Sequence, residues 1–365
     1  MTPTTETRTL PVRDGFPDLA YLRNTDCSAC QVDPTAPQST RGRTAERPQQ
    51  IPPLGWWDIA WRVAKRLGSD NVTLVAGGVA MYTLLSVFPG LAAAVSIYGM
   101  FATPADVVEH MKAFSGVLPP GVWEIFRTQL QNLTRHAQST LSIAAAIGLL
   151  IALWSARSAM SALMTAANVA YGELEKRGFF RQILISLLLT LGAVVGFLLM
   201  LLLGIVIPLA LHILGTRFWV QTAADVLQWM LLWGFAVLGL AVVYRYAPAR
   251  EHAQWRWVTW GSATAATLWL GASALFAFYV RTFASYGKTY GALGGIVAML
   301  MWFYISSLMV VLGAEINSEM ERQTKEDTTT GPPTPLGQRG AYAADTVGPS
   351  ANEGTKQPDR TPVGR

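Results

Sequence analysis

The sequence predicts an all-α integral membrane protein built from six transmembrane helices. Hydrophobic residues make up 51% and charged residues only 14% of the chain, whereas soluble domains carry about 25% charged residues. The mean hydropathy is +0.31. Six apolar segments follow one another, each long enough to supply the ~20 residues with which a helix crosses a bilayer. The predicted spans are about 72–101, 141–164, 183–214, 226–247, 258–280 and 290–314.

The last apolar segment shows the membrane pattern most clearly. It is uncharged from Thr289 to Ala314 and meets its first charge at Glu315. A carboxylate at the end of a span is costly in lipid unless it is paired or reaches water. Glu315 therefore needs either a cationic partner or an aqueous position.

Two polar tails flank the membrane domain, which we place at 54–320. Residues 1–53 are rich in Pro, Thr, Arg and Gln, and residues 321–365 in Thr, Pro, Gly and Asp. Both compositions are typical of disordered segments. Residues 54–70 combine Trp and aliphatic residues at helical spacing with Arg and Lys, which predicts an N-terminal amphipathic helix in the membrane interface. A soluble amphipathic helix is the alternative.

The charges in the loops predict the orientation. Lys and Arg near the membrane are more numerous beside the tails and the even loops than beside the odd loops. Because such residues accumulate on the cytoplasmic side, both termini are expected to be cytoplasmic. The longest loop, about 102–140, carries two predicted amphipathic helices, 105–115 and 121–136. These would cap the bundle or, alternatively, form a gate or a substrate-collecting surface.

Charge and cysteine content indicate no further function. The net charge of +5 comes from Lys and Arg placed between apolar segments, which is the pattern of topology signals rather than of a nucleic-acid surface. Cys27 and Cys30 form a lone CxxC in the N-terminal tail. A redox or zinc role would be one interpretation, but without a second pair or a nearby His we favour an incidental pair.

No pattern of catalytic residues is present in the sequence. A metal-dependent nuclease needs clustered His and Asp ligands. The chain has no HxHxDH run, no Ser/His/Asp grouping and no P-loop. We therefore predict no catalytic, metal or cofactor-binding residue, no cofactor and no enzymatic activity. The four histidines are scattered over different loops and spans: His110, His136, His212 and His252.

A polar stripe runs along the second span. Arg157, Ser161, Thr165 and Asn168 fall at i, i+4, i+8 and i+11. This spacing is close to three whole helical turns, so the four side chains share one face. Because hydrocarbon offers no polar partner, the face must meet protein or water.

The last span carries a second polar face. Tyr304, Ser307, Glu315 and Ser318 lie along it, and Asn317 lies at the same end. Each is a residue type that is costly to bury in lipid alone. These side chains are therefore candidates for a functional or structural polar cluster with the stripe of the second span.

We expect Arg157 and Glu315 to pair across the two polar faces. The predicted topology places both near the cytoplasmic ends of their spans, and a guanidinium with a carboxylate forms a bidentate contact. The alternative is that Arg157 extends to the interface and Glu315 lies beyond the lipid edge. If the pair forms, it gates transport or locks two helices, and locking is the favoured role.

Small residues predict close helix packing. Gly192 and Gly196 in the third span, and Gly291 and Gly295 in the sixth, have the GxxxG spacing that lets helices approach. Packing within one chain is the first interpretation. Association of several copies into a homo-oligomer is the second.

Pro89 interrupts the first span. A proline inside a helix frees the carbonyl of the preceding turn and kinks the helix. Ser86 lies one turn earlier and is expected to satisfy that carbonyl. A static kink is the favoured interpretation, with a broken transporter helix as the alternative.

Three ordered motifs also resemble a known family. The sequence has AMYTLLSVFP at 80–89; SAR at 155–157, NVAY at 168–171 and EKRGF at 175–179; and YG at 286–287 and 290–291, Trp302 and GAEIN at 313–317. Over about 54–320 the chain resembles the YihY/virulence factor BrkB family. Gly77 and Gly78 depart from it, since the family more usually has alanines there. The resemblance implies a multi-pass protein of the bacterial inner (cytoplasmic) membrane, of undefined biochemistry, with members formerly labelled ribonuclease BN.

Together these observations favour a transporter-like or lipid- and amphiphile-handling protein. Its polar groups are few, which suits a hydrophobic or amphiphilic substrate better than a hydrated ion. A non-transporting envelope or scaffold protein is the alternative, and ribonuclease activity is disfavoured. The expected partners are membrane lipids and this substrate, without nucleic acid. The sequence does not indicate the substrate's identity, the direction of transport or the energy source.

Overall fold

The computed structural model describes residues 38–98, 141–213, 218–283 and 292–354. Within these ranges the regular elements are all helices. The predicted helices at 105–115 and 121–136, Cys27 with Cys30, and Gly291 lie outside the described residues. The same holds for most of the N-terminal tail.

Six long helices form the membrane domain, as predicted. Each contains a segment long and apolar enough to cross a membrane. Three of them end later than expected, since the second span continues to Tyr171, the fifth to Phe283 and the sixth to Glu321. The helices are α2 (Val72–Tyr98), α5 (Leu141–Tyr171), α6 (Phe179–Ile213), α7 (Phe218–Tyr246), α8 (Trp255–Phe283) and α10 (Ala292–Glu321).

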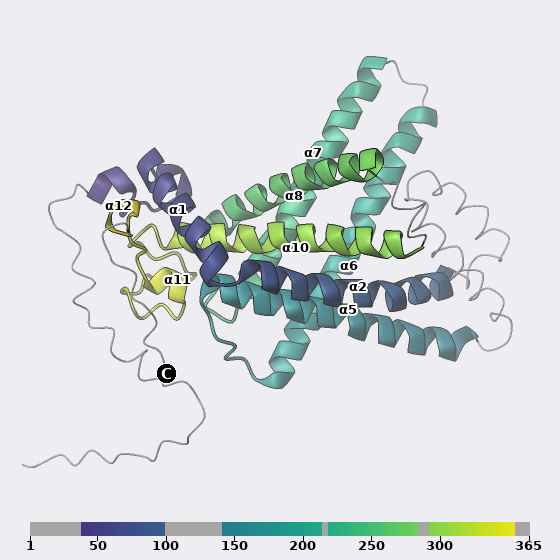
Figure 1. The fold of residues 1–365 in the computed structure, drawn as a ribbon, viewed down its shortest axis with the longest axis horizontal. Coiled ribbons are helices and arrows are strands. Elements are labelled where there is room, and N and C mark those ends of the chain that lie inside the picture. Colours follow the sequence, from purple (N-terminus) through teal and green to yellow (C-terminus); the bar gives the residue numbers. More distant parts are fainter. Residues whose placement is uncertain (1–37, 99–140, 214–217, 284–291, 355–365) are drawn as a thin grey trace, which may run out of the picture.

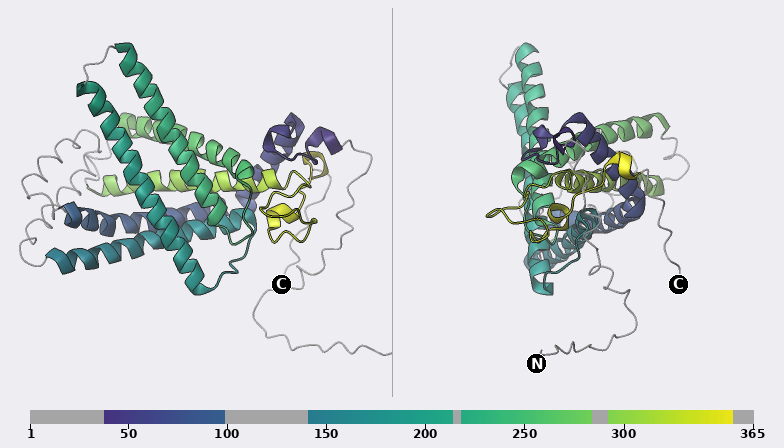
Figure 2. Two further views of the ribbon diagram at one scale, coloured as in Figure 1. Left: turned by 180° about the vertical axis from the view of Figure 1, so that it is seen from behind. Right: turned by 90° about the vertical axis from the view of Figure 1, so that its left-hand side faces the viewer.

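The six helices are arranged in two groups (Figure 1). Helices α8, α10, α2 and α5 lie side by side in this order, and α10 contacts both α8 and α2. Helices α6 and α7 form an antiparallel pair that crosses this layer at a steep angle (Figure 2). The pair contacts the layer through α5 and α8. We call the end of the bundle at which α5 and α10 finish the terminal end.

The bundle buries small side chains and exposes large ones. The largest buried cluster consists mainly of alanines, with Tyr171 and Tyr244. On α6, in contrast, Leu188, Leu191 and Phe197 are exposed. Small residues at helix contacts and long apolar residues outside are typical of a helical protein surrounded by lipid.

The α8–α10 contact depends on two glycines. A Cβ atom added to Gly313 would lie 2.5 Å from the Cβ of Ala265 and 3.0 Å from the carbonyl oxygen of Gly261. The first distance is shorter than two carbon atoms tolerate and the second is tight, so the two helices meet closely at this point. The glycine of the GAEIN motif is therefore a packing residue.

The predicted GxxxG positions differ in their surroundings. A Cβ atom on Gly196 would lie 3.4 Å from the Phe235 ring of α7, whereas one on Gly192 would meet nothing within 4 Å. Only Gly196 of this pair thus lies at a helix contact in the described part of the chain. Gly295 is partly buried in α10.

Helix α2 continues through Pro89, but Ser86 does not act as expected. The Ser86 hydroxyl donates to the carbonyl of Thr83 at 2.7 Å. The carbonyl that Pro89 leaves without an N–H donor is that of Leu85. Side chains in a helix point toward its N-terminus, and a serine hydroxyl reaches carbonyls three or four residues earlier. Ser86 therefore cannot reach Leu85, and that prediction is wrong.

Parts of both predicted tails are folded against the terminal end (Figure 1). Arg43 donates to the carbonyl of Gly348 at 2.7 Å, while Gln323 and Thr324 are fully buried. The described residues 38–53 and 322–354 therefore differ from the predicted disorder. The prediction of disorder rested on composition, which shows that these segments have little apolar surface to bury. In the structure, hydrogen bonds between the two segments hold them in place. Their short helical elements are Gln38–Arg41, Pro48–Gln50, α11 (Tyr342–Asp345) and α12 (Ala351–Gly354).

The predicted amphipathic helix is present as α1 (Pro53–Ser69). Its apolar residues Ile59 and Val63 pack against Trp257 of α8 and Met320 of α10. Much of the apolar face thus contacts protein, although Trp57 remains exposed. The position of α1 in the membrane interface stays a prediction.

We predict that Gly313→Ala destabilises the protein. The added methyl group collides with α8, and overpacking of this kind costs about 1–3 kcal/mol. Gly271→Ala on α8 is the matched control, because a Cβ atom there meets nothing within 4 Å. Thermal unfolding in detergent should show a lower midpoint for Gly313→Ala only. Equal midpoints for the two variants would contradict the close α8–α10 contact.

Candidate functional site

Arg157 and Glu315, which we expected to pair, have different partners. The Arg157 Nε donates to the hydroxyl of Ser186 on α6 at 3.1 Å. Its guanidinium also lies 4.8 Å from the centre of the Trp154 ring. Glu315 instead contacts Arg66 of α1, with 3.4 Å between Arg66 Nη1 and Glu315 Oε2. The predicted Arg157–Glu315 pair is therefore wrong.

The length of α5 explains why the pair does not form. Because α5 continues to Tyr171, Arg157 lies roughly 20 Å from its end at 1.5 Å of rise per residue. Glu315 lies level with that end, since Arg66 Nη1 also donates to the carbonyl of Ala170 at 2.9 Å. Arg157 is thus deep in its span and Glu315 is at the terminal end.

Glu315 belongs to a group that we call the terminal ionic cluster. Its members are Arg62, Arg66, Glu315, Glu319 and Arg322. Glu319 is fully buried and contacts three of the arginines: Arg62, Arg66 at 3.1 Å and Arg322 at 2.6 Å. Compensation of one buried carboxylate by several guanidinium groups keeps these charges stable away from water.

Arg66 joins three helices. Besides Glu315, Glu319 and the Ala170 carbonyl, it donates to the hydroxyl of Ser318 at 3.3 Å. Burial by itself would lower the pKa of Arg66, but Glu319 and Glu315 raise the pKa above its ordinary value. The guanidinium therefore stays charged and ties α1 to the ends of α5 and α10.

The spacing of charges in the sequence carries a signal for this cluster. Arg62 and Arg66 are four residues apart on α1, and Glu315 and Glu319 are four residues apart on α10. Residues at i and i+4 lie one turn apart on the same face. Two basic and two acidic positions with equal spacing on neighbouring helices would have indicated a ladder of ion pairs.

Asn317 joins α10 to α8, and Asn168 joins α5 to the turns that follow α5 and α7. Asn317 accepts a hydrogen bond from the Gly261 N–H at 2.9 Å and donates to the Val258 carbonyl at 3.1 Å, both on α8. Asn168 accepts from the Ala249 N–H at 2.7 Å and donates to Glu175 at 3.1 Å. Each amide uses both its oxygen and its nitrogen in hydrogen bonds to other parts of the chain, so both residues have a structural role.

The remaining predicted residues of α10 do not join Arg157. Ser307 is buried and Tyr304 is partly buried. Ser318 is buried beside Arg66. The polar face of α10 is therefore divided between the helix contacts and the terminal ionic cluster.

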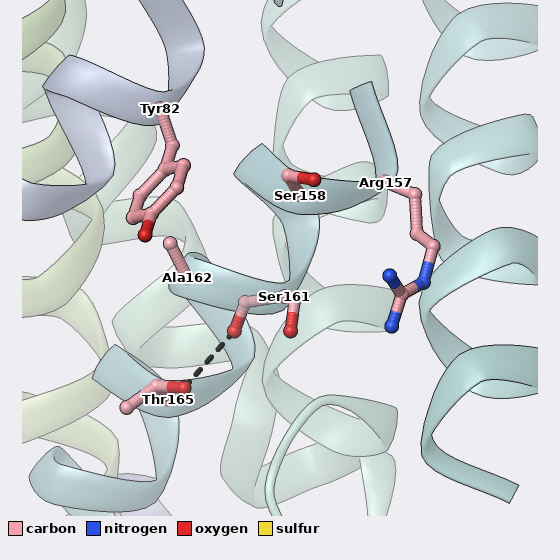
Figure 3. A pocket seen from close by; sticks show the side chains of 6 residues that line it. All are labelled: Tyr82, Arg157, Ser158, Ser161, Ala162 and Thr165. Carbon is pink, nitrogen blue, oxygen red and sulfur yellow. Dashed lines mark hydrogen bonds between the residues drawn. The ribbon is translucent and has the colours of Figure 1, made fainter. Parts of the chain in front are cut away.

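The polar stripe of α5 lines a cleft, which we call the α5 cleft (Figure 3). Its volume is about 280 Å³. The structure brings together three of the four predicted stripe residues and adds two polar residues that sequence reasoning missed, Tyr82 of α2 and Ser158. Tyr82 belongs to the first family motif, which was the available signal. The lining residues are Tyr82, Arg157, Ser158, Ser161, Ala162 and Thr165.

Hydrogen bonds within α5 determine which donors of the cleft are available to a ligand. Ser158 donates to the Trp154 carbonyl and Thr165 to the Ser161 carbonyl, each at 3.1 Å. Their hydroxyl hydrogens are thus used within the helix. Arg157, which lines the cleft, makes one hydrogen bond to described residues, through Nε. Its two terminal nitrogens have no acceptor among the described residues.

No carboxylate of the described residues lines the α5 cleft. Among the described residues, no carboxylate lies within ion-pair distance of Arg157. The described ranges also contain no group of three or more His, Cys, Asp or Glu side chains that could hold a metal ion. The cleft is therefore cationic and rich in hydroxyl groups.

This fold and these polar groups define a six-span helical membrane protein with a packed ionic cluster at one end and an open polar cleft within its spans. The chain belongs to the family described as virulence factor BrkB, which it matches over residues 63–336. The resemblance inferred from the three motifs is thus confirmed.

Similar proteins come from several bacteria. The chain is 32% identical over 253 residues to YfkH of Bacillus subtilis, whose name calls it ribonuclease-like, covering 68% of this chain and 89% of the relative. It is 29% identical over 277 residues to a UPF0761 membrane protein of Aeromonas salmonicida, covering 73% and 90%. It is 26% identical over 265 residues to one of Tolumonas auensis, covering 71% and 83%. No solved structure matches the chain.

We predict that Arg66 and Glu315 are energetically coupled, whereas Arg157 and Glu315 are not. Arg66→Ala and Glu315→Ala should each lower the free energy of unfolding. The double variant should lose about 0.5–3 kcal/mol less than the sum of the two single losses, because the residues are in contact. The losses in free energy of unfolding from Arg157→Ala and Glu315→Ala should add within about 0.5 kcal/mol, because distant sites act independently. Unfolding in detergent measures both cycles. Additive losses for Arg66 and Glu315 would show that their contact contributes nothing.

A pH-dependent contribution is expected from Glu175 in the α5–α6 turn. Hydrogen bonds from Arg177, at 2.8 and 2.9 Å, lower the pKa of Glu175. A carboxylate with a lowered pKa stabilises the fold above its unfolded pKa and loses this effect as the pH falls through the folded value.

The midpoint difference between the native protein and Glu175→Gln should therefore be largest near neutral pH and shrink on acidification. Melting curves over a pH series would measure it. Glu251→Gln, at an exposed carboxylate of the α7–α8 turn, is the control. A difference that is constant with pH would contradict the assigned role of Glu175.

Proposed function

We propose that this protein binds and moves an amphiphile, with the polar headgroup in the α5 cleft. The observation that carries the proposal is Arg157, a cation deep within a membrane span that lines an open cleft. A charged residue at the centre of a spanning helix costs about 2.5–3.5 kcal/mol on insertion scales. Such residues commonly mark a substrate path or a proton relay.

Locking of helices accounts poorly for Arg157. Its described hydrogen bond is a single one, to the neutral hydroxyl of Ser186. The strong contacts between helices lie elsewhere, in the terminal ionic cluster and in the α8–α10 contact. Arg157 could be replaced by an apolar residue without losing an ion pair to the described residues, which favours a role toward a ligand.

The size of the cleft favours an amphiphile over a complete polar solute. Pockets for small molecules usually measure about 300–1,000 Å³, and the α5 cleft, at about 280 Å³, is at the lower limit. It has room for a headgroup. Trp154 is exposed, and its ring lies 4.8 Å from the Arg157 guanidinium, so an acyl chain would have an apolar side chain to lie against beside the headgroup.

The proposal places the protein in the bacterial inner membrane with both termini in the cytoplasm, and it involves no enzymatic step. The α5 cleft opens among the spans, as expected for a path along which a headgroup crosses the hydrocarbon while its tails remain in lipid. A non-transporting scaffold protein remains the competing function. It would need the polar stripe only for helix packing.

We expect Thr165→Trp to abolish amphiphile movement without unfolding the protein. Thr165 is exposed and lines the cleft, so an indole group there fills the headgroup space. Thr259→Trp is the matched control, because Thr259 is also exposed and also donates to its own helix, at 2.7 Å. The assay is transfer of a fluorescent phospholipid between leaflets of vesicles that contain the full-length protein.

Movement by the native protein and by Thr259→Trp, but not by Thr165→Trp, supports the proposal. Absence of transfer by the native protein for every lipid tested would favour the scaffold function. Equal transfer by both tryptophan variants would show that the path lies outside the α5 cleft.

A further inference from the structure

We infer that the headgroup bound in the α5 cleft is an oxyanion, a phosphate or carboxylate group held by Arg157. This inference rests on the proposed function and goes further, because it specifies the charge and the hydrogen-bonding character of the amphiphile. It follows from three properties of the cleft: its excess of donors, the orientation of Arg157 and the distribution of charge around it.

The cleft contains hydrogen-bond donors that have no acceptor among the described residues. The two terminal nitrogens of Arg157 have no acceptor among the described residues, and neither do the hydroxyls of Tyr82 and Ser161. A guanidinium only donates, and a hydroxyl can donate. A ligand that satisfies these groups must therefore be rich in acceptor oxygens, as phosphate and carboxylate groups are.

The Arg157 side chain is held before any ligand binds. The Ser186 hydroxyl accepts from Nε at 3.1 Å, and the Trp154 ring lies 4.8 Å from the guanidinium carbon. Figure 3 shows the side chain extending from α5 toward α6, with Tyr82 on the α2 side of the cleft. A planar fork fixed in this way matches two oxygens of one oxyanion and loses little entropy on binding.

The charges around the cleft exclude a cationic headgroup as the preferred ligand. None of the lining residues is acidic, and Glu315, at the terminal end, is level with Ala170. Arg157 lies about 20 Å from that level. A quaternary amine alone would place like charges together without a described carboxylate to offset them. An oxyanion neutralises Arg157, the one charged side chain among the described residues that line the cleft.

Two sources could supply such an oxyanion: the headgroup of a membrane amphiphile, or a free phosphate in the aqueous phase. The exposed apolar surface of Trp154, whose ring lies 4.8 Å from the Arg157 guanidinium, favours the amphiphile. Free phosphate has no group to place against that surface. The experiment therefore compares both sources.

The first measurement is binding, because it does not depend on transport. The melting midpoint of the full-length protein in neutral detergent is followed during titration with phosphatidylglycerol, phosphatidylcholine, a neutral glycolipid or inorganic phosphate. We expect phosphatidylglycerol to stabilise at roughly tenfold lower concentration than the neutral glycolipid, as for a charge-assisted contact. Inorganic phosphate alone should have little effect.

Variants of Arg157 then locate the contact. Arg157→Gln should remove the preference for phosphatidylglycerol, and Arg157→Lys should keep only part of it, since a lysine retains the charge but not the planar fork. The matched control is Arg281→Gln at the end of α8, where the arginine is exposed. It should retain the full preference.

The second measurement is leaflet transfer of the same lipids in vesicles of phosphatidylcholine. Equal binding and transfer of all lipids, unchanged by Arg157→Gln, would overturn the oxyanion inference while the proposed function stands. Selective binding without transfer of any lipid would support the inference and overturn the proposed movement. Stabilisation by inorganic phosphate equal to that by phosphatidylglycerol would overturn the amphiphile as the source. If Arg157→Gln does not fold, the lipid series on the native protein decides.

Discussion

The terminal end of the bundle depends on the buried carboxylate of Glu319. Its negative charge compensates the positive charges of Arg62, Arg66 and Arg322. Arg62 in turn donates to the carbonyl of Pro349 at 3.0 Å. Through these contacts one side chain positions α1, α10 and the C-terminal segment together. Removing one partner of a buried ion pair commonly costs about 3–5 kcal/mol, because the remaining charge stays buried without compensation.

The use of hydrogen-bonding groups distinguishes Glu319 and Asn317 from Arg157. Glu319 and Asn317 have their hydrogen-bonding groups used within the fold. Arg157 has only its Nε used by the described residues. Since a buried or membrane-embedded donor without an acceptor is costly, the groups left open are those for which a ligand would make the largest difference. This contrast supports packing roles for Glu319 and Asn317, and it is the reason why we propose binding at the α5 cleft.

Much of the fold could be predicted, and part of the site. Apolar length located all six helices, and helical spacing correctly grouped Arg157, Ser161 and Thr165 on one face. The polar faces of the spans did not identify the partner of Glu315, because Arg66 reaches it from α1, outside the spans. The matching i, i+4 spacing of the charges on α1 and α10 was the available signal. The folded tails were missed for a similar reason: contacts such as that between Arg43 and Gly348 join opposite ends of the chain.

The sequence by itself determined that this is a six-span membrane protein of the BrkB family with a polar stripe on its second span. These properties follow from the local length and period of apolar residues, and from motifs read along the chain. Only the tertiary structure decided which charges meet. Whether Arg157 reaches Glu315 depends on the depth of each in the bundle, and this is set by where α5 ends, at Tyr171, and by the packing of α1 across α10. The helical period defines a face, whereas partners across helices are defined by depth and packing.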